Sequence, residues 1–242
     1  MEGLEAPAGS ERTPLHRRMI VPRATPVIDR PVHAVLAGAA AVGLCGMPVV
    51  ALVPLGPLSA HMAHHIALMS VLAPICAVAL APLVQDRIAW SRGAVLWIGA
   101  FLQIALLWAW HAPPLHAATM AGTAYAVMLA TLLAAAVCFW GGILLLAPRS
   151  RWQAIVALLA TGKLACLLGA LLIFARRPLF VHATIHVDAH SLDDQQLAGL
   201  LMVVACPLSY VLVGVVLSAQ LMHGIGAGAE QRARPRIAAS WR

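Results

Sequence analysis

Histidines gather at the start of one apolar stretch, where residues 61–65 are His-Met-Ala-His-His. Successive residues of a helix are turned by about 100°, so His61, His64 and His65 share an arc of about 100°. His61 and His65 stack one turn apart on it, with Met69 one further turn along. Imidazole and thioether together suit copper, and thioether favours Cu(I). The spacing predicts a metal site that uses His61, His65, His64 and Met62, whereas an ordinary interfacial role would leave these histidines bound to water and lipid headgroups.

A second pair of histidines flanks a proline turn. His111 and His116 stand on either side of Pro113-Pro114. Proline ends a helix and restricts the residue before it, which fixes the direction in which the chain leaves. We expect His111 to lie at the mouth of a site begun by His61 and His65, or to serve as an interfacial anchor beside its tryptophan neighbours.

A third group precedes the last apolar stretch. His182, His186 and His190 recur every four residues, and they could form a lid, a second metal site, an entry funnel or only a solvated loop. Asp194 follows them. It, or Asp193, is suited to cap the next helix, and Asp194 could also join the metal site or orient one of its histidines.

Composition decides the setting for this chemistry. Of 242 residues, 62% are hydrophobic and only 10% are charged, against roughly 25% charged in a soluble domain. A nucleic-acid partner is excluded despite the net charge of +7, because the basic residues lie between apolar runs and form no patch. Six stretches reach the roughly 20 residues that cross a bilayer as a helix. They are predicted at His33–Val53, Ala60–Val84, Gly93–His111, Thr123–Ala147, Gln153–Ala175 and Leu197–Gln220.

The predicted fold is therefore an all-α bundle of six transmembrane helices. Of the arginines only Arg176 and Arg177 fall on one side of these spans, so the positive-inside rule places both termini in the cytoplasm. Residues 1–31 form a basic arm, 32–220 the membrane domain and 221–242 a basic tail. His61, His65 and the other histidine groups then share the outer side.

Lys163 is the one lysine of the chain and falls inside the fifth span. A cation at that depth costs roughly 2.5–3.5 kcal/mol. We expect it to face the bundle interior beside a polar partner such as Gln103.

Several short motifs follow one another in an order that resembles the CtaG-type assembly factors of bacterial haem–copper cytochrome c oxidases. The resemblance covers residues 59–202. It rests on His61-Met62-x-x-His65, Ala73-Pro74, Ala81-Pro82-Leu83, Trp108-x-Trp110-His111-x-Pro113, Leu168-Gly169-Ala170-Leu171-Leu172, Arg177-Pro178-Leu179-Phe180 and Asp194-Gln195-Gln196-Leu197-Ala198-Gly199-Leu200-Leu201-Met202. The chain departs from the family early in the fourth span, where Tyr125 and Leu129 replace histidines.

The resemblance implies a non-catalytic membrane protein of the bacterial inner membrane that matures the oxidase by handling copper at its outer face. Oxidase subunits, the lipid bilayer and a soluble outer-side copper chaperone are the implied partners. Two alternatives stay open. A zinc-dependent intramembrane hydrolase would use His61, His65, His186 and Asp194, although no carboxylate stands beside the histidine pair as in H-E-x-x-H motifs. A haem-binding protein would need two axial histidines facing each other.

Overall fold

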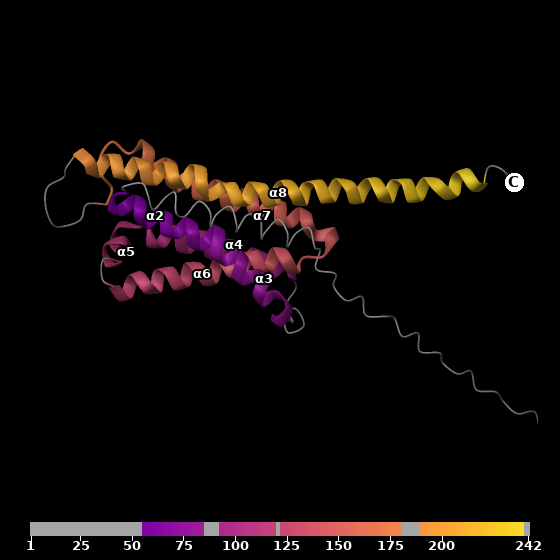
Figure 1. Ribbon diagram of the computed structural model, residues 1–242, viewed down its shortest axis with the longest axis horizontal. Helices are drawn as coiled ribbons and strands as arrows, with labels where there is room; N and C mark the ends of the chain where they lie inside the picture. Colours follow the sequence, from indigo (N-terminus) through magenta and orange to yellow (C-terminus); the bar gives the residue numbers. More distant parts are fainter. Residues whose placement is uncertain (1–54, 85–91, 120–121, 181–188, 240–242) are drawn as a thin grey trace, which may run out of the picture.

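The computed structural model describes residues 55–84, 92–119, 122–180 and 189–239. This part of the chain is helical and contains no strand, which confirms the predicted all-α class. Its elements are α2 (Pro57–Ala67), the π-helix η1 (Leu68–Leu72), α3 (Ala73–Val84), α4 (Arg92–Trp110), α5 (Pro113–Ala118), α6 (Gly122–Leu145), the 3-10 turn η2 (Pro148–Ser150), α7 (Arg151–Phe174) and α8 (Ala189–Ala239). The helices lie side by side, and α8 runs the length of the bundle and extends beyond it (Figure 1).

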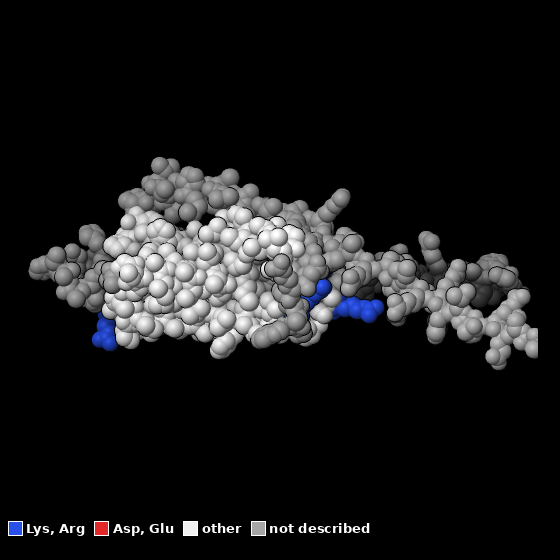
Figure 2. Space-filling model, turned by 90° about the horizontal axis from the view of Figure 1, so that it is seen from below, with Lys and Arg blue, Asp and Glu red and all other residues white. Residues whose placement is uncertain are grey.

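Five helical segments of the described chain are long and apolar enough to cross a membrane. They are Pro57–Val84, Arg92–Trp110, Gly122–Leu145, Pro148–Phe174 and Ser191–His223. They match the second to sixth predicted spans, whereas the first, His33–Val53, lies outside the described residues. On the face seen in Figure 2, lysine and arginine side chains appear only at the two ends of the bundle. The uncharged middle of this face fits a bundle that spans a bilayer.

The second span is continuous but contains a π-helical turn. The amide of Ala73 donates to the carbonyl of Leu68, five residues back. The carbonyl of Met69, which Ala73 would bind in an α-helix, accepts instead from the indole of Trp140 at 2.9 Å. Pro74 follows at once and has no amide to give, so a widened turn is favoured here. The π-turn thereby ties the second span to α6 in the core.

Small residues set the closest helix contacts. A Cβ added to Gly199 on α8 would lie 2.5 Å from the carbonyl oxygen of Gly169 on α7, and one on Gly169 would lie 2.8 Å from that of Gly199. A Cβ added to Gly142 on α6 would lie 2.5 Å from the Cα of Leu96 on α4. Glycine is required at these positions by proximity, as is common where helices associate in membranes.

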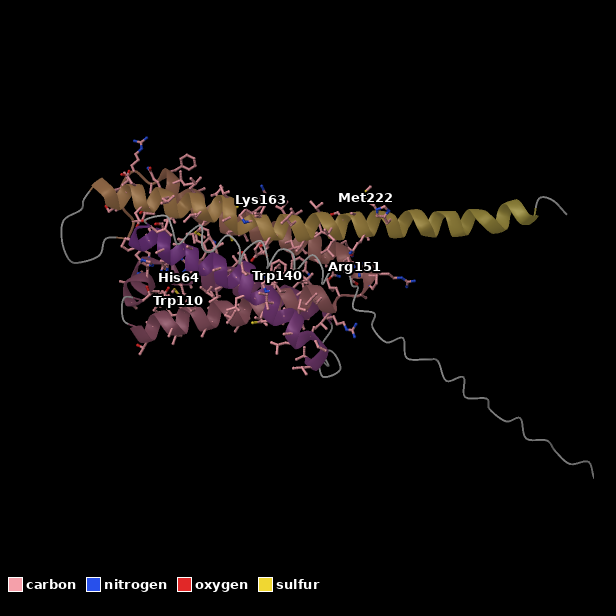
Figure 3. The ribbon with its side chains drawn as sticks, viewed as in Figure 1. His64, Trp110, Trp140, Arg151, Lys163 and Met222 are labelled. Carbon is pink, nitrogen blue, oxygen red and sulfur yellow. The ribbon has the colours of Figure 1, made fainter. Side chains whose placement is uncertain are left out.

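Lys163 lies on the outside of α7 and not in the bundle interior, so that prediction is wrong (Figure 3). The buried face of α7 is a stripe of small and apolar residues that includes Ala157, Thr161, Ala165 and Gly169. That stripe packs against its neighbours, and the angular position of Lys163 falls outside it. Gln103 instead donates to the hydroxyl of Tyr210.

The contact between α7 and α8 gives a test of this packing. We expect Gly199→Ala to lower the melting temperature of the detergent-solubilised protein, because overfilling a packed contact costs about 1–3 kcal/mol. Gly214→Ala on the same helix is the control, since a Cβ there meets nothing within 4 Å. Equal melting temperatures for the two variants would contradict the close contact.

Candidate metal centre

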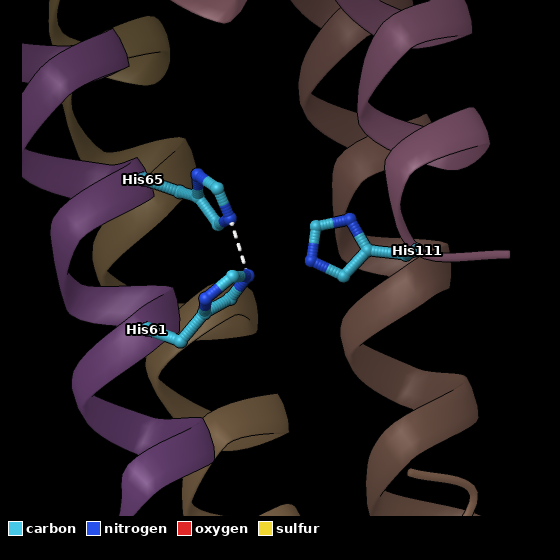
Figure 4. A group of neighbouring side chains, drawn as sticks. All are labelled: His61, His65 and His111. Carbon is cyan, nitrogen blue, oxygen red and sulfur yellow. Dashed lines mark hydrogen bonds between the residues drawn. The ribbon is translucent and has the colours of Figure 1, made fainter. Parts of the chain in front are cut away.

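Four histidines of the first two groups meet at the end of the bundle where α2 begins and α4 ends; His64 is not among them. His61 and His65 point from α2 toward His111, which follows α4 (Figure 4). One nitrogen from each of the three lies within 4.8 Å of the others. The predicted convergence of these two groups is therefore present. We call His61, His65, His111 and His116 the histidine cluster.

His116 reaches the cluster because of the proline turn. Ala112 adopts an extended conformation before Pro113, which takes the first position of α5. The chain reverses within a few residues, and His116 lies with its ring centroid 5.3 Å from that of His61 and 6.1 Å from that of His111. The proline pair predicted that the chain leaves α4 in a fixed direction. Only the short helix α5 brings His116 back to the other histidines.

The cluster is almost completely buried. The exposed fractions are 8% for His61, 2% for His65, 4% for His111 and 4% for His116. His61 and His65 share a hydrogen bond between their Nε2 atoms, 2.9 Å apart. One ring must donate and the other accept, so the pair holds at least one imidazole nitrogen with a lone pair. A metal ion bound to both rings would replace this hydrogen bond.

His111 is oriented by its own helix. Its Nδ1 lies 2.6 Å from the carbonyl oxygen of Leu107, so Nδ1 carries the proton and donates. Burial lowers the pKa of His111 below its ordinary value, an effect that the hydrogen bond to Leu107 opposes. The lowered pKa favours the neutral ring. Its buried Nε2, for which the described chain offers no hydrogen-bond partner, has the lone pair that a metal ligand needs.

Two aromatic rings wall the cluster. The ring of Tyr125, from the first turn of α6, lies 5.6 Å from that of His61. Phe180, after the end of α7, lies 4.1 Å from His116 and 6.4 Å from His111. In the sequence, Tyr125 is a departure from the family. Phe180 is only the last residue of the motif Arg177-Pro178-Leu179-Phe180, with no predicted role at the metal site. The aromatic ring of Tyr125 thus stands beside His61.

The remaining predicted ligands are elsewhere. His64 is exposed on the outer side of α2, and Met62 is fully buried in the apolar core. Asp194 binds the start of α2, with Oδ2 accepting from the amide of Leu58 at 2.8 Å and Oδ1 from that of Ser59 at 3.1 Å. The prediction that Asp193 or Asp194 caps the last helix is wrong, because α8 already starts at Ala189. His182 and His186 lie outside the described residues, as does the side chain of His190.

The cluster has the donors of a metal site but no anion. Two nitrogens on one tetrahedral ion, bound at about 2.0–2.1 Å, lie about 3.4 Å apart. The nitrogens of His61, His65 and His111 lie within 4.8 Å of one another, which is somewhat wider than this spacing. The donor group contains imidazoles only. Residues of this kind fit copper or zinc and give the ion no compensating charge.

The sequence matches the family described as cytochrome c oxidase caa3 assembly factor (Caa3_CtaG) over residues 13–224. No curated protein and no solved structure matches the chain.

Burial predicts a sharp contrast in reactivity toward diethylpyrocarbonate, which modifies accessible imidazoles. In the metal-free protein we expect His64 to be modified rapidly and His61, His65, His111 and His116 to be protected. Phe180→Ala removes the ring that covers His116 and should raise its modification rate severalfold, while His64 stays unchanged as the internal reference. Mass spectrometry of the peptides measures both rates. Similar rates for His64 and the cluster would show that the cluster is open.

Proposed function

The chain belongs to the caa3-type cytochrome c oxidase assembly factor family, and we propose that it binds a copper ion through His61, His65 and His111 and passes it to an oxidase subunit. The observation that supports this proposal is the buried group of three imidazoles within 4.8 Å. Oxidases of the haem–copper type need copper as a cofactor, so a copper ligand set in a factor that assembles them has a direct use.

The charge of the cluster favours Cu(I). Transferring an ion into a buried site costs free energy that rises with the square of its charge. Neutral imidazoles do not offset this cost, and no carboxylate or thiolate belongs to the donor group in the described chain. A monovalent ion is therefore held at a much smaller penalty than Zn²⁺ or Cu²⁺. Three imidazoles also leave room for a fourth ligand from the recipient, which suits transfer.

The position of the cluster suits an acceptor outside the membrane. It lies at the end of the bundle where the second span begins and the third ends, the outer side according to the arginine distribution. We infer that the protein resides in the bacterial plasma membrane, receives copper from a soluble chaperone on the outer side and hands it to the oxidase there. His116, at the edge of the donor group, is placed to take part in this exchange.

A hydrolase is less well supported by the geometry. A zinc hydrolase needs a carboxylate near the metal-bound water, and the carboxylate of Asp194 is occupied by two amides and the hydroxyl of Ser59. A haem would need space for a macrocycle between two imidazoles. The rings of the cluster instead pack with centroids 4.5–6.1 Å apart. Binding without turnover is the function that the arrangement supports best.

Copper binding is tested with the detergent-purified protein and a Cu(I) chelator in competition. We expect about one Cu(I) per chain, and His61→Ala, His65→Ala or His111→Ala to weaken binding at least about 100-fold, because each removes a ligand. His64→Ala is the matched control on the same helix and should bind like wild type. Folded wild-type protein that binds no Cu(I) would exclude copper carriage. Binding that is lost equally in His64→Ala would exclude the proposed ligand set.

The same variants give a prediction for cells. We expect His61→Ala and His111→Ala to lower the copper content and activity of the oxidase when copper is scarce, while the assembly factor itself accumulates normally. Metal analysis of purified oxidase measures this. Oxidase that is fully loaded with copper in both variants would contradict delivery through the cluster.

A further inference from the structure

The last helix begins close to the histidine cluster but contributes no ligand to it from the described side chains. Two consecutive residues of α8, Asp194 and Gln195, bind two different segments of the chain there. Their sequence neighbours Asp193 and Gln196 are both exposed, whereas Gln195 is 1% exposed. Asp194 and Gln195 instead bind backbone groups of other segments. Their own helix does not require these contacts, which indicates a role in positioning those segments.

Asp194 supplies the missing cap of α2. The helix begins after Gly56, which has no side chain, and Pro57 at its first position has no amide hydrogen. The next two amides, of Leu58 and Ser59, donate to the two carboxylate oxygens of Asp194. The hydroxyl of Ser59 also binds this carboxylate. A cap normally comes from the residue before the helix; here it comes from a residue 136 positions away in the chain.

Gly56 shows that the chain makes room for this arrangement. A Cβ built on Gly56 would collide with the carboxyl group of Asp194. The carboxylate thus occupies the space that the side chain of a local cap would fill. Because His61 lies two residues after Ser59, in the second turn of α2, this contact fixes both the axial position and the rotation of the helix that carries His61 and His65.

Gln195 fixes the segment after α7 that carries Phe180. Its Oε1 accepts from the amide of Leu179 at 2.6 Å, and its Nε2 donates to the carbonyl of Leu172 at 3.2 Å. The two bonds tie the segment after α7 to the last turns of α7 itself. Phe180 follows Leu179 directly and packs on His116 at 4.1 Å. Gln195 therefore determines where the ring that covers the cluster lies.

We infer that Asp194 and Gln195 are positioning residues for the histidine cluster, Asp194 for the pair His61 and His65 through α2 and Gln195 for His116 and His111 through Phe180. The inference rests on the proposed copper function for its meaning, although the geometry that it describes exists without metal. Neither residue needs to touch the ion. Together they make α8 the reference element against which two sides of the site are aligned.

Two matched pairs of variants test this inference. Asp194→Ala is compared with Asp193→Ala, and Gln195→Leu with Gln196→Leu, so each change has a control of the same chemistry one residue away. We expect the Kd for Cu(I) to rise about 10- to 100-fold in Asp194→Ala and in Gln195→Leu, the range found when groups behind metal ligands are removed. Both controls should keep the wild-type Kd. Asp194→Asn retains one acceptor and should fall between Asp194→Ala and wild type.

Diethylpyrocarbonate labelling of the metal-free variants separates positioning from a general loss of structure. Asp194→Ala should expose His61 and His65, whereas Gln195→Leu should expose His116 and His111. Gly56→Ala, which displaces the carboxylate of Asp194 without removing it, should reproduce the Asp194→Ala pattern. Equal exposure of all four histidines in both variants would mean an ordinary stabilising role and overturn the inference, as would unchanged labelling and Kd.

The two proposals fail in different ways. Wild-type protein that binds no Cu(I) while the variants still show the two selective labelling patterns would remove the copper function and leave the positioning inference standing. Wild-type protein that binds Cu(I) with the same Kd as Asp194→Ala and Gln195→Leu would remove the positioning inference alone.

Discussion

A helix that starts with glycine and proline has no local group to accept its first free amides, and α2 starts in this way. The carboxylate of Asp194, on the neighbouring helix α8, accepts them. The same two hydrogen bonds thus stabilise the first turn of α2 and align this helix with α8. A cap is worth about 1 kcal/mol in an ordinary helix, but a cap supplied by another helix also fixes a relative position. The two histidines of α2 depend on that position.

Burying the polar rings of the histidine cluster costs free energy, which the surrounding structure must offset. Polar nitrogens in a buried place need partners, and the cluster meets this need partly within itself, through the bond between His61 and His65, and partly through the carbonyl of Leu107. The Nε2 of His111 is left with no hydrogen-bond partner in the described chain. A buried nitrogen of this kind is stabilised when it binds a metal ion, so metal binding would relieve the cost of burying it.

Tight packing makes the arrangement reproducible. The close approach of α7 and α8 at Gly169 and Gly199 places the residues near the start of α8 at a fixed height against the end of α7. Gln195 can then reach Leu172 and Leu179 at once. Trp140, bound to the carbonyl that the π-turn releases, plays the corresponding part for the second span. Both contacts lie away from the cluster, yet each limits how far the helices that bear it can slide.

The sequence by itself determined the second to sixth apolar spans and the shared face of His61 and His65, because hydrophobic length and helical spacing are local properties. The family, too, follows from the order of short motifs along the chain. Which residues join that face was decided by the tertiary structure. His111 and His116 join His61 and His65 through a proline turn whose direction depends on packing. Asp194 caps α2 instead of its own helix, and Lys163 faces outward. These placements depend on how the helices pack against one another, which local sequence patterns do not specify.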